Sequence, residues 1–186
     1  MVETPSVMIP LGTQAPDFYL PDTISGKTSS LDELKSDRVT VIMFICNHCP
    51  YVKHILTELV ELANDYIQKG TAFIAISSND VNNYPDDSPE KMKELAERLE
   101  FPFPYLYDET QEVARAYNAA CTPDFYIFDG WMKLAYRGQF DDSRPNSGIP
   151  VTGQDIRSAL ERVLAGEPVD QHQKPSMGCN IKWKNG

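Results

Sequence analysis

The chain has 186 residues, of which 41% are hydrophobic and 24% charged, and its formal net charge at pH 7 is -10. This composition is typical of a globular protein with one domain, here 1–186, with 1–10 and 167–186 as terminal arms. The negative charge argues against nucleic acid and anionic membranes as partners. Because no apolar run is long enough to span a bilayer and no signal peptide is visible, we expect a cytoplasmic protein.

Strands and helices are expected to alternate along the first half of the chain. Residues 1–38 form an arm with short strands and a helical turn near 31–35. The apolar run 39–45 is typical of a buried strand, and 71–77 repeats this pattern. Between them, 51–69 carries apolar residues at the spacing of one helix face, which predicts an amphipathic helix.

The second half continues this alternation. Helices are expected from Ser88-Pro89-Glu90 to about residue 99 and over 109–117. Strands are expected at 103–107, 125–128 and 134–137, the last two as a hairpin around Asp129-Gly130, and the final helix covers 152–165, with Thr152 as N-cap, Asp155 completing a capping box and Gly166 ending it. This order predicts an α/β fold, a mixed central sheet with helices on both faces.

Two cysteines, Cys46 and Cys49, lie where the first buried strand gives way to the long helix. Unpaired backbone N–H groups at a helix start carry partial positive charge, which favours a thiolate. Two thiols at this spacing can close a disulfide, so that one attacks a substrate disulfide and the other resolves the mixed intermediate. The pair therefore predicts a dithiol redox site, with Cys46 as nucleophile because it should be nearer the helix start and more exposed.

The residues around the pair fit this chemistry. His48 lies between the cysteines and can stabilise the Cys46 thiolate when protonated, and Pro50 suits the first turn of a helix. One alternative is a zinc site, because His48 and His54 add imidazole ligands, but no second close pair of ligands follows. We therefore expect no metal and no cofactor. Another alternative is two thiols without a role, although a strand-to-helix turn is a poor place for inert core filling.

A second motif, Thr122-Pro123, precedes the aromatic run 124–129. Proline belongs at the first residue of a strand, and an X-Pro bond there is a candidate cis bond. Together with the C-x-x-C pair, this motif resembles the thioredoxin superfamily. The resemblance implies a three-layer sandwich in which a cis-proline loop faces the cysteines and pairs with bound substrate, so Thr122, Pro123, His48 and Pro50 are expected at the substrate-binding site.

The opening segment narrows the resemblance. Gly12-Thr13-Gln14-Ala15-Pro16-Asp17-Phe18, followed by Gly26-Lys27, is similar to the N-terminal extension of peroxiredoxins and of related membrane-linked thioredoxin-like reductases. The segments 126–130 and 137–145 and the tail 178–183 resemble a peroxiredoxin-like branch. Members of that branch are labelled as relatives of alkyl hydroperoxide reductase and thiol-specific antioxidant, or as probable thiol-disulfide isomerases.

The departures from these families bear on mechanism. In the peroxiredoxin pattern, Cys49 matches the peroxidatic cysteine, Cys46 stands at the threonine position and Ile42 at the proline position. No arginine is evident beside the cis-proline loop, so the frame that would hydrogen-bond a peroxide is missing. Relative to thioredoxin, Ile45 replaces the tryptophan before the first cysteine, and Thr40 replaces the buried aspartate that handles the second cysteine's proton.

Two further cysteines are candidate redox thiols. Cys121 lies two positions before Pro123 and either joins the site or packs under the loop as a small residue. Cys179 lies in a polar tail; some peroxiredoxins resolve a sulfenic acid with a tail cysteine, and the alternative is a tail thiol without a role. Arg137 and Arg144 can bind an anion, but loop arginines are usually solvated.

These observations favour a thiol-disulfide oxidoreductase that uses Cys46 and Cys49. Its expected partners are protein or small-molecule disulfides, or hydroperoxides, and an external dithiol reductant. One alternative is a peroxiredoxin-like thiol peroxidase. Another is a redox-responsive binding module, in which the disulfide switches a surface without turnover. The sequence does not indicate an oligomeric state.

Overall fold

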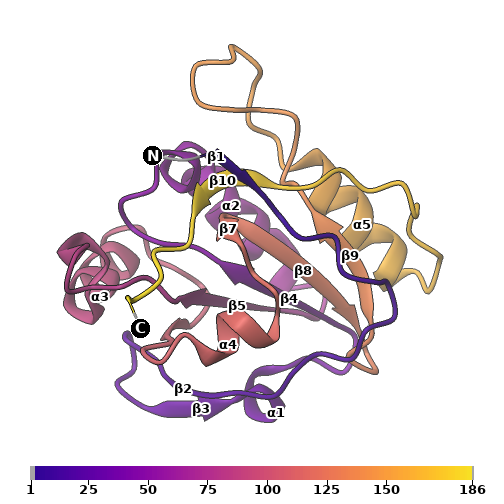
Figure 1. Cartoon of the computed structure of the whole chain (residues 1–186). Coiled ribbons are helices and arrows are strands. Elements are labelled where there is room, and N and C mark those ends of the chain that lie inside the picture. Colours follow the sequence, from indigo (N-terminus) through magenta and orange to yellow (C-terminus); the bar gives the residue numbers. More distant parts are fainter. Residues whose placement is uncertain (1–2, 186) are drawn as a thin grey trace.

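The centre of the molecule is a five-stranded mixed sheet (Figure 1). A computed structural model describes residues 3–185. The strands, in the order β6-β5-β4-β8-β9, are β6 Tyr105–Tyr107, β5 Thr71–Ser77, β4 Val39–Phe44, β8 Asp124–Asp129 and β9 Leu134–Gly138. Strand β4 pairs parallel with β5 and antiparallel with β8, which places it in the middle of the sheet.

Helices cover both faces of this sheet (Figure 1). They are α1 Leu31–Leu34, α2 Pro50–Ile67, α3 Pro89–Arg98, α4 Glu112–Ala116 and α5 Gln154–Leu164. The alternation of side chains along β4 serves both faces: Val41 and Met43 pack in the core beneath α2 and α5, whereas Ile42 and Phe44 pack in the core beneath α4. The predicted three-layer α/β sandwich is therefore confirmed.

The start of α5 differs from the expectation. Gly153, with φ +63°, is the N-cap residue instead of Thr152, and as a glycine it has no side chain to cap the helix. The carboxylate of Asp141 accepts hydrogen bonds from the backbone N–H groups of Thr152 and Gly153, at 2.7 and 2.8 Å. Asp155 completes no capping box, because its carboxylate accepts a hydrogen bond from Gln139. A distant acidic side chain thus replaces the local cap that the sequence suggested.

Parts of both expected terminal arms belong to a second sheet. Strands β1 Glu3–Pro5, β10 Met177–Asn180 and β7 Cys121–Thr122 form a three-stranded antiparallel sheet in the order β1-β10-β7. Figure 1 shows β1 and β10 side by side near the start of α2. In the N-terminal extension, β2 Tyr19–Pro21 and β3 Thr28–Ser30 form a hairpin. The C-terminal segment is therefore joined to the strand before the cis-proline loop.

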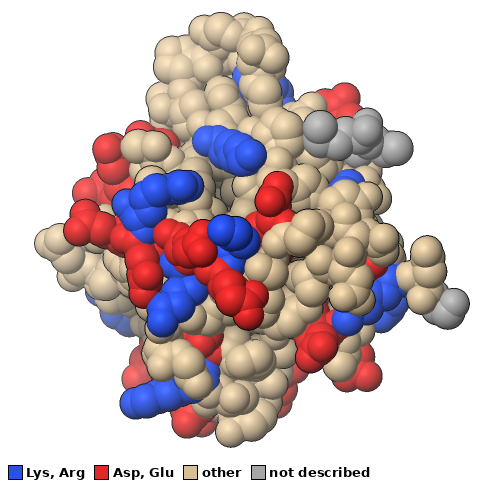
Figure 2. Space-filling model, turned by 90° about the vertical axis from the view of Figure 1, so that its left-hand side faces the viewer, with Lys and Arg blue, Asp and Glu red and all other residues tan. Residues whose placement is uncertain are grey.

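The surface over α3 carries interspersed charges of both signs (Figure 2). Two ion pairs lie on this helix, Lys91–Glu94 at 2.7 Å and Lys93–Glu97 at 3.8 Å. Within residues 3–185, none of the helices has both the length and the hydropathy that crossing a bilayer requires.

Candidate active site: three thiols at the start of helix α2

The central strand and the longest helix place the cysteine pair. Strand β4 ends at Phe44, and the backbone N–H of Ile45 still donates to Ile76 O at 3.0 Å. The chain then turns into α2, of which Cys49 is the N-cap and Pro50 the first residue. Pro50 has no N–H to leave unpaired at this position. The predicted strand-to-helix location of the pair is confirmed.

Asp87 holds the loop between the cysteines. This buried carboxylate accepts hydrogen bonds from the backbone N–H groups of Asn47 and His48, at 2.8 and 3.1 Å, and from Asn79 Nδ2 at 2.8 Å. Burial raises the pKa of Asp87, but hydrogen bonds from His48 and Asn79 outweigh it and lower the pKa overall. The sequence places Asp87 in a polar, turn-rich segment, and no local motif pointed to this role.

His48 lies beside Cys46, but its ring serves Asp87 first. His48 Nδ1 is 2.5 Å from Asp87 Oδ2 and 3.9 Å from Cys46 Sγ. One face of the His48 ring stacks on the ring of Tyr84, with the ring centroids 5.2 Å apart. Cys46 therefore faces an imidazole that is already paired with a carboxylate.

The hydrogen bonds between the thiols place negative charge on Cys49. A hydrogen bond from the Cys46 thiol lowers the pKa of Cys49; burial opposes this, and further hydrogen bonds from Cys179 and the backbone N–H of Val52 add to it. The same hydrogen bond to Cys49, followed by burial and the charge of Asp87, raises the pKa of Cys46. These opposite shifts favour the thiolate on Cys49 over the thiolate on Cys46.

The two reasons for expecting Cys46 to attack first are wrong. Cys49, not Cys46, caps helix α2. The expected difference in exposure is absent, because Cys46 is 1% exposed and Cys49 is 0% exposed. The loop between the cysteines is held by the hydrogen bonds that its backbone donates to Asp87.

Cys179 lies next to the pair, although it is distant from the pair in sequence and belongs to the polar C-terminal segment. Its Sγ is 3.0 Å from Cys49 Sγ, and its side chain is buried. It comes from β10, where Cys179 is opposite Thr122 of β7. Gly178 makes this approach possible, because a Cβ atom there would overlap the carbonyl oxygen of Thr122. The pairing of β10 with β7 is nonlocal, so no local pattern could have predicted it.

The loop at Thr122-Pro123 faces the cysteines, and its peptide bond is cis, as predicted. Thr122 Oγ1 is 3.4 Å from Cys46 Sγ, and the carbonyl oxygen of Thr122 is 3.2 Å from Cys49 Sγ, where it accepts the thiol proton when Cys49 is protonated. The resemblance implied that the backbone of this loop is open to a substrate. Instead, Thr122 is paired with Cys179 of β10.

Cys121 is buried beneath the loop, with a different environment. Its thiol donates to the carbonyl oxygen of Pro123 at 3.6 Å. Burial, followed by the charge of Asp124, raises its pKa far above that of an ordinary thiol. A thiol that stays protonated is a poor nucleophile, so the structure favours the packing role for Cys121.

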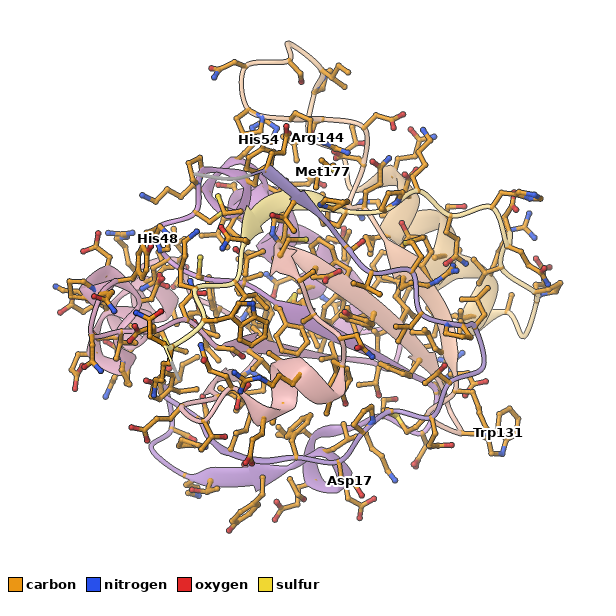
Figure 3. All side chains as sticks on the ribbon, in the orientation of Figure 1. Asp17, His48, His54, Trp131, Arg144 and Met177 are labelled. Carbon is orange, nitrogen blue, oxygen red and sulfur yellow. The ribbon has the colours of Figure 1, made fainter. Side chains whose placement is uncertain are left out.

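The other candidate polar residues point elsewhere. Figure 3 shows His54 and Arg144 close to Met177, and these three residues line one pocket together with Pro123. His54 Nε2 is 3.1 Å from Ser143 Oγ, so the zinc set that would use His54 is not assembled. Arg137 donates to the carbonyl oxygen of Ile9 at 2.7 Å.

One group of possible metal ligands does occur at the site. Donor atoms of Cys46, His48 and Asp87 lie within 4.8 Å of one another. A structural zinc site is almost always four-coordinate, and the carboxylate of Asp87 is already hydrogen-bonded to the loop and to Asn79. These three residues fit a hydrogen-bonded brace for the loop better than a metal centre.

The fold and the site together define a class of protein. A three-layer α/β sandwich with a C-x-x-C pair at a helix start, facing a cis-proline loop, is the arrangement of the thioredoxin superfamily. The AhpC/TSA family model matches residues 11–137, and the chain belongs to this family.

Known proteins agree with this placement. A crystal structure of an uncharacterised conserved protein from Geobacillus kaustophilus is 64% identical, with a TM-score of 0.98, covering 100% of this chain and 98% of that one. The thiol-disulfide oxidoreductase ResA from Geobacillus kaustophilus (strain HTA426) is 27% identical over 162 residues, which are 86% of this chain and 82% of ResA. Peroxidoxin BcpB from Mycobacterium tuberculosis shares the fold, with a TM-score of 0.62 at 20% identity over 84% of this chain and 96% of that one. The family match and the likeness to ResA bear out the expected enzyme class, an oxidoreductase.

Proposed function

We propose that the protein is a thiol-disulfide oxidoreductase that cycles Cys46 and Cys49 between dithiol and disulfide. The observation that carries this proposal is the placement of the pair at the start of α2, against the cis-proline loop: Thr122 Oγ1 is 3.4 Å from Cys46 Sγ, and the carbonyl oxygen of Thr122 is 3.2 Å from Cys49 Sγ. A thiolate is the species that attacks a disulfide. The likeness to ResA, which is named for this activity, supports the same reaction.

The proposed reaction has two exchange steps. The Cys49 thiolate attacks one sulfur of a substrate disulfide, forms a mixed disulfide and releases the other substrate sulfur as a thiolate. Cys46 then gives up its proton and attacks Cys49, which releases the second substrate sulfur and leaves a Cys46–Cys49 disulfide. An external dithiol restores the pair by the same exchanges in reverse.

The approach of the substrate is expected on the His48 side of the pair. The His48 side chain is 19% exposed, and Tyr84, which stacks on it, is 37% exposed. The cysteines themselves are buried, so a substrate must displace part of this rim. Pro50 and the Thr122-Pro123 loop adjoin the cysteines and are expected to contact the substrate.

The proposal is tested by trapping. The test uses a Cys179→Ser background, which leaves the pair alone at the site. In this background we expect Cys46→Ser to accumulate a mixed disulfide with a protein that carries intact disulfide bonds, such as insulin. Cys49→Ser should fail to react, because the resting thiolate is gone. Mass spectrometry identifies the trapped cysteine, and Cys121→Ser serves as the control for loss of a buried thiol.

Three outcomes contradict parts of this proposal. A complex trapped by Cys49→Ser would restore Cys46 as the first nucleophile. Full alkylation of both thiols after mild oxidation, or bound zinc that accounts for them, would remove the redox couple. A single stoichiometric oxidation without turnover in the presence of dithiothreitol would favour the redox-responsive binding module.

A further inference from the structure

We propose that Cys179 is a third redox thiol, which replaces Cys46 as the disulfide partner of Cys49 by an internal disulfide exchange. This inference rests on the proposed function, because it needs the Cys46–Cys49 disulfide as its starting point. It adds a second disulfide, Cys49–Cys179, to the cycle, and it makes Cys49 the shared member of both.

The distance between the sulfur atoms suits this exchange. Cys49 Sγ and Cys179 Sγ are 3.0 Å apart, whereas a disulfide bond is about 2.05 Å long. A movement of about 1 Å therefore forms the bond. Helix α2, whose N-cap is Cys49, packs against β10, which carries Cys179, so both residues come from regular elements.

Neighbouring contacts hold Cys179 in this place. Strand β10 lies between β1 and β7, so it is hydrogen-bonded on both edges. Just before β10, Ser176 Oγ donates to the carbonyl oxygen of Pro123 at 2.6 Å, and just after it the N–H of Ile181 donates to Ala120 O at 3.1 Å. These bonds tie the strand to both sides of the cis-proline loop, and such anchoring is more than a tail residue without a role requires.

The exchange is balanced within the three thiols. The Cys179 thiolate attacks Cys49 Sγ; the Cys49–Cys179 bond forms, the Cys46–Cys49 bond breaks, and Cys46 leaves as a thiolate. The sulfur of Cys179 is oxidised and that of Cys46 is reduced, so no outside oxidant is needed. The proton that Cys179 loses is taken up by Cys46.

The charges at the site support the same order of events. In the reduced protein, burial and the hydrogen bond to Cys49 raise the pKa of Cys179, while the charge of Lys182 lowers it. Once Cys49 is in a disulfide, it carries no charge, and it no longer raises the pKa of Cys179. Cys179 then loses its proton more readily than in the resting state, which is when a resolving thiol is needed.

Tryptic mapping tests the proposal directly. Cleavage places Cys46 and Cys49 together in peptide 39–53, Cys179 in 163–182 and Cys121 in 116–133. After oxidation of the reduced protein with diamide and alkylation of the remaining thiols, Cys46→Ser should yield peptides 39–53 and 163–182 joined by a disulfide, in a monomer on a nonreducing gel. Cys49→Ser should yield no joined peptide, and Cys121→Ser should behave as the unaltered protein.

The unaltered protein supplies the second measurement, which needs no variant to fold. We expect two products: peptide 39–53 lighter by two hydrogens, and the joined pair. If only the first product forms, and Cys46→Ser leaves both remaining site thiols open to alkylation, the third thiol is overturned while the proposed function stands. If only the joined pair forms, at the earliest times after diamide addition as well as at the end, Cys179 is redox-active and the Cys46–Cys49 couple is overturned. If neither forms, both proposals fail.

Discussion

Cys49 occupies the point where donors from three parts of the chain converge. The thiols of Cys46 and Cys179 and the backbone N–H of Val52 all favour its thiolate. The pair itself, and the cis-proline loop opposite it, were predictable because short motifs carry them. Asp87 was not predictable, and Cys179 was a candidate only through the resemblance to peroxiredoxins, since the contacts that bring each to the site join segments far apart in the sequence.

The first prediction concerns the charge on Cys49. Replacing Cys46 by alanine removes the largest cause that lowers the pKa of Cys49, so we expect that pKa to rise. Burial, which the hydrogen bond opposed, then acts more strongly. The ultraviolet absorbance of the thiolate, followed against pH, measures the shift, and Cys121→Ala is the control. An unchanged or lower pKa would place the resting charge elsewhere.

At the scale of elements, strand β8 begins with a buried acid. Asp124 is opposite Phe44 at the end of β4 and directly follows the cis-proline. Its Oδ2 accepts from the hydroxyl of Tyr126 at 3.2 Å, whereas its Oδ1 has no hydrogen-bond partner. Burial raises the pKa of Asp124 to about 7. The apolar strand pattern was visible in the sequence, but the burial of its first residue was not.

The second prediction follows from this raised pKa. Between its unfolded pKa, about 4, and about 7, the folded protein keeps a proton on Asp124 that the unfolded chain has lost, so stability falls as pH rises through this window. Asp124→Asn removes this effect. Relative to the unaltered protein, its free energy of unfolding should gain up to about 4 kcal/mol from pH 4 to pH 8.

Urea denaturation at several pH values measures this difference. The exposed Asp86→Asn is the control and should follow the pH profile of the unaltered protein. Parallel profiles for Asp124→Asn and the unaltered protein would show that Asp124 titrates at the same pH in both states.

The predicted elements were most accurate where the pattern itself reflects the core. Residues 39–45 and 71–77 alternate between two buried faces, and both strands are found almost as expected. The end of a helix depends instead on which group satisfies its backbone. For α5 that group is Asp141, from outside the helix, so the sequence-based cap at Thr152 was wrong.

At the scale of the whole molecule, two of the arginines, Arg137 and Arg115, are bound to groups other than the thiols. Arg137 is bound to Ile9 and Gln173, and the guanidinium of Arg115 lies 5.0 Å from the centroid of the Trp183 ring. Neither therefore supplies the donor that the sequence left missing beside the cis-proline loop. The AhpC/TSA family match gives the fold, whereas the reaction depends on these local groups.

The third prediction separates the disulfide reaction from the peroxide reaction. We expect the reduced protein to react slowly with hydrogen peroxide compared with a disulfide substrate, because loss of one well-placed donor lowers a rate by about 10²–10³. Single-turnover kinetics, followed by the fluorescence of Trp183, measure both. Trp131→Phe removes the exposed reporter at the β8–β9 turn. Peroxide oxidation as fast as that of a true peroxiredoxin measured alongside would make the thiol peroxidase the better assignment.

The pairing of β10 with β7 also sets a competition. A peptide that would add itself to the edge of β7 that faces β10 must first displace β10, a strand of the same chain that is paired with Thr122. A tethered segment acts as a ligand at an effective concentration on the order of millimolar. Peptides with ordinary affinity for that edge therefore remain unbound at cellular concentrations. Selection of substrates then depends on the side chains around the disulfide, and small disulfides, which need no strand edge, meet no such competitor.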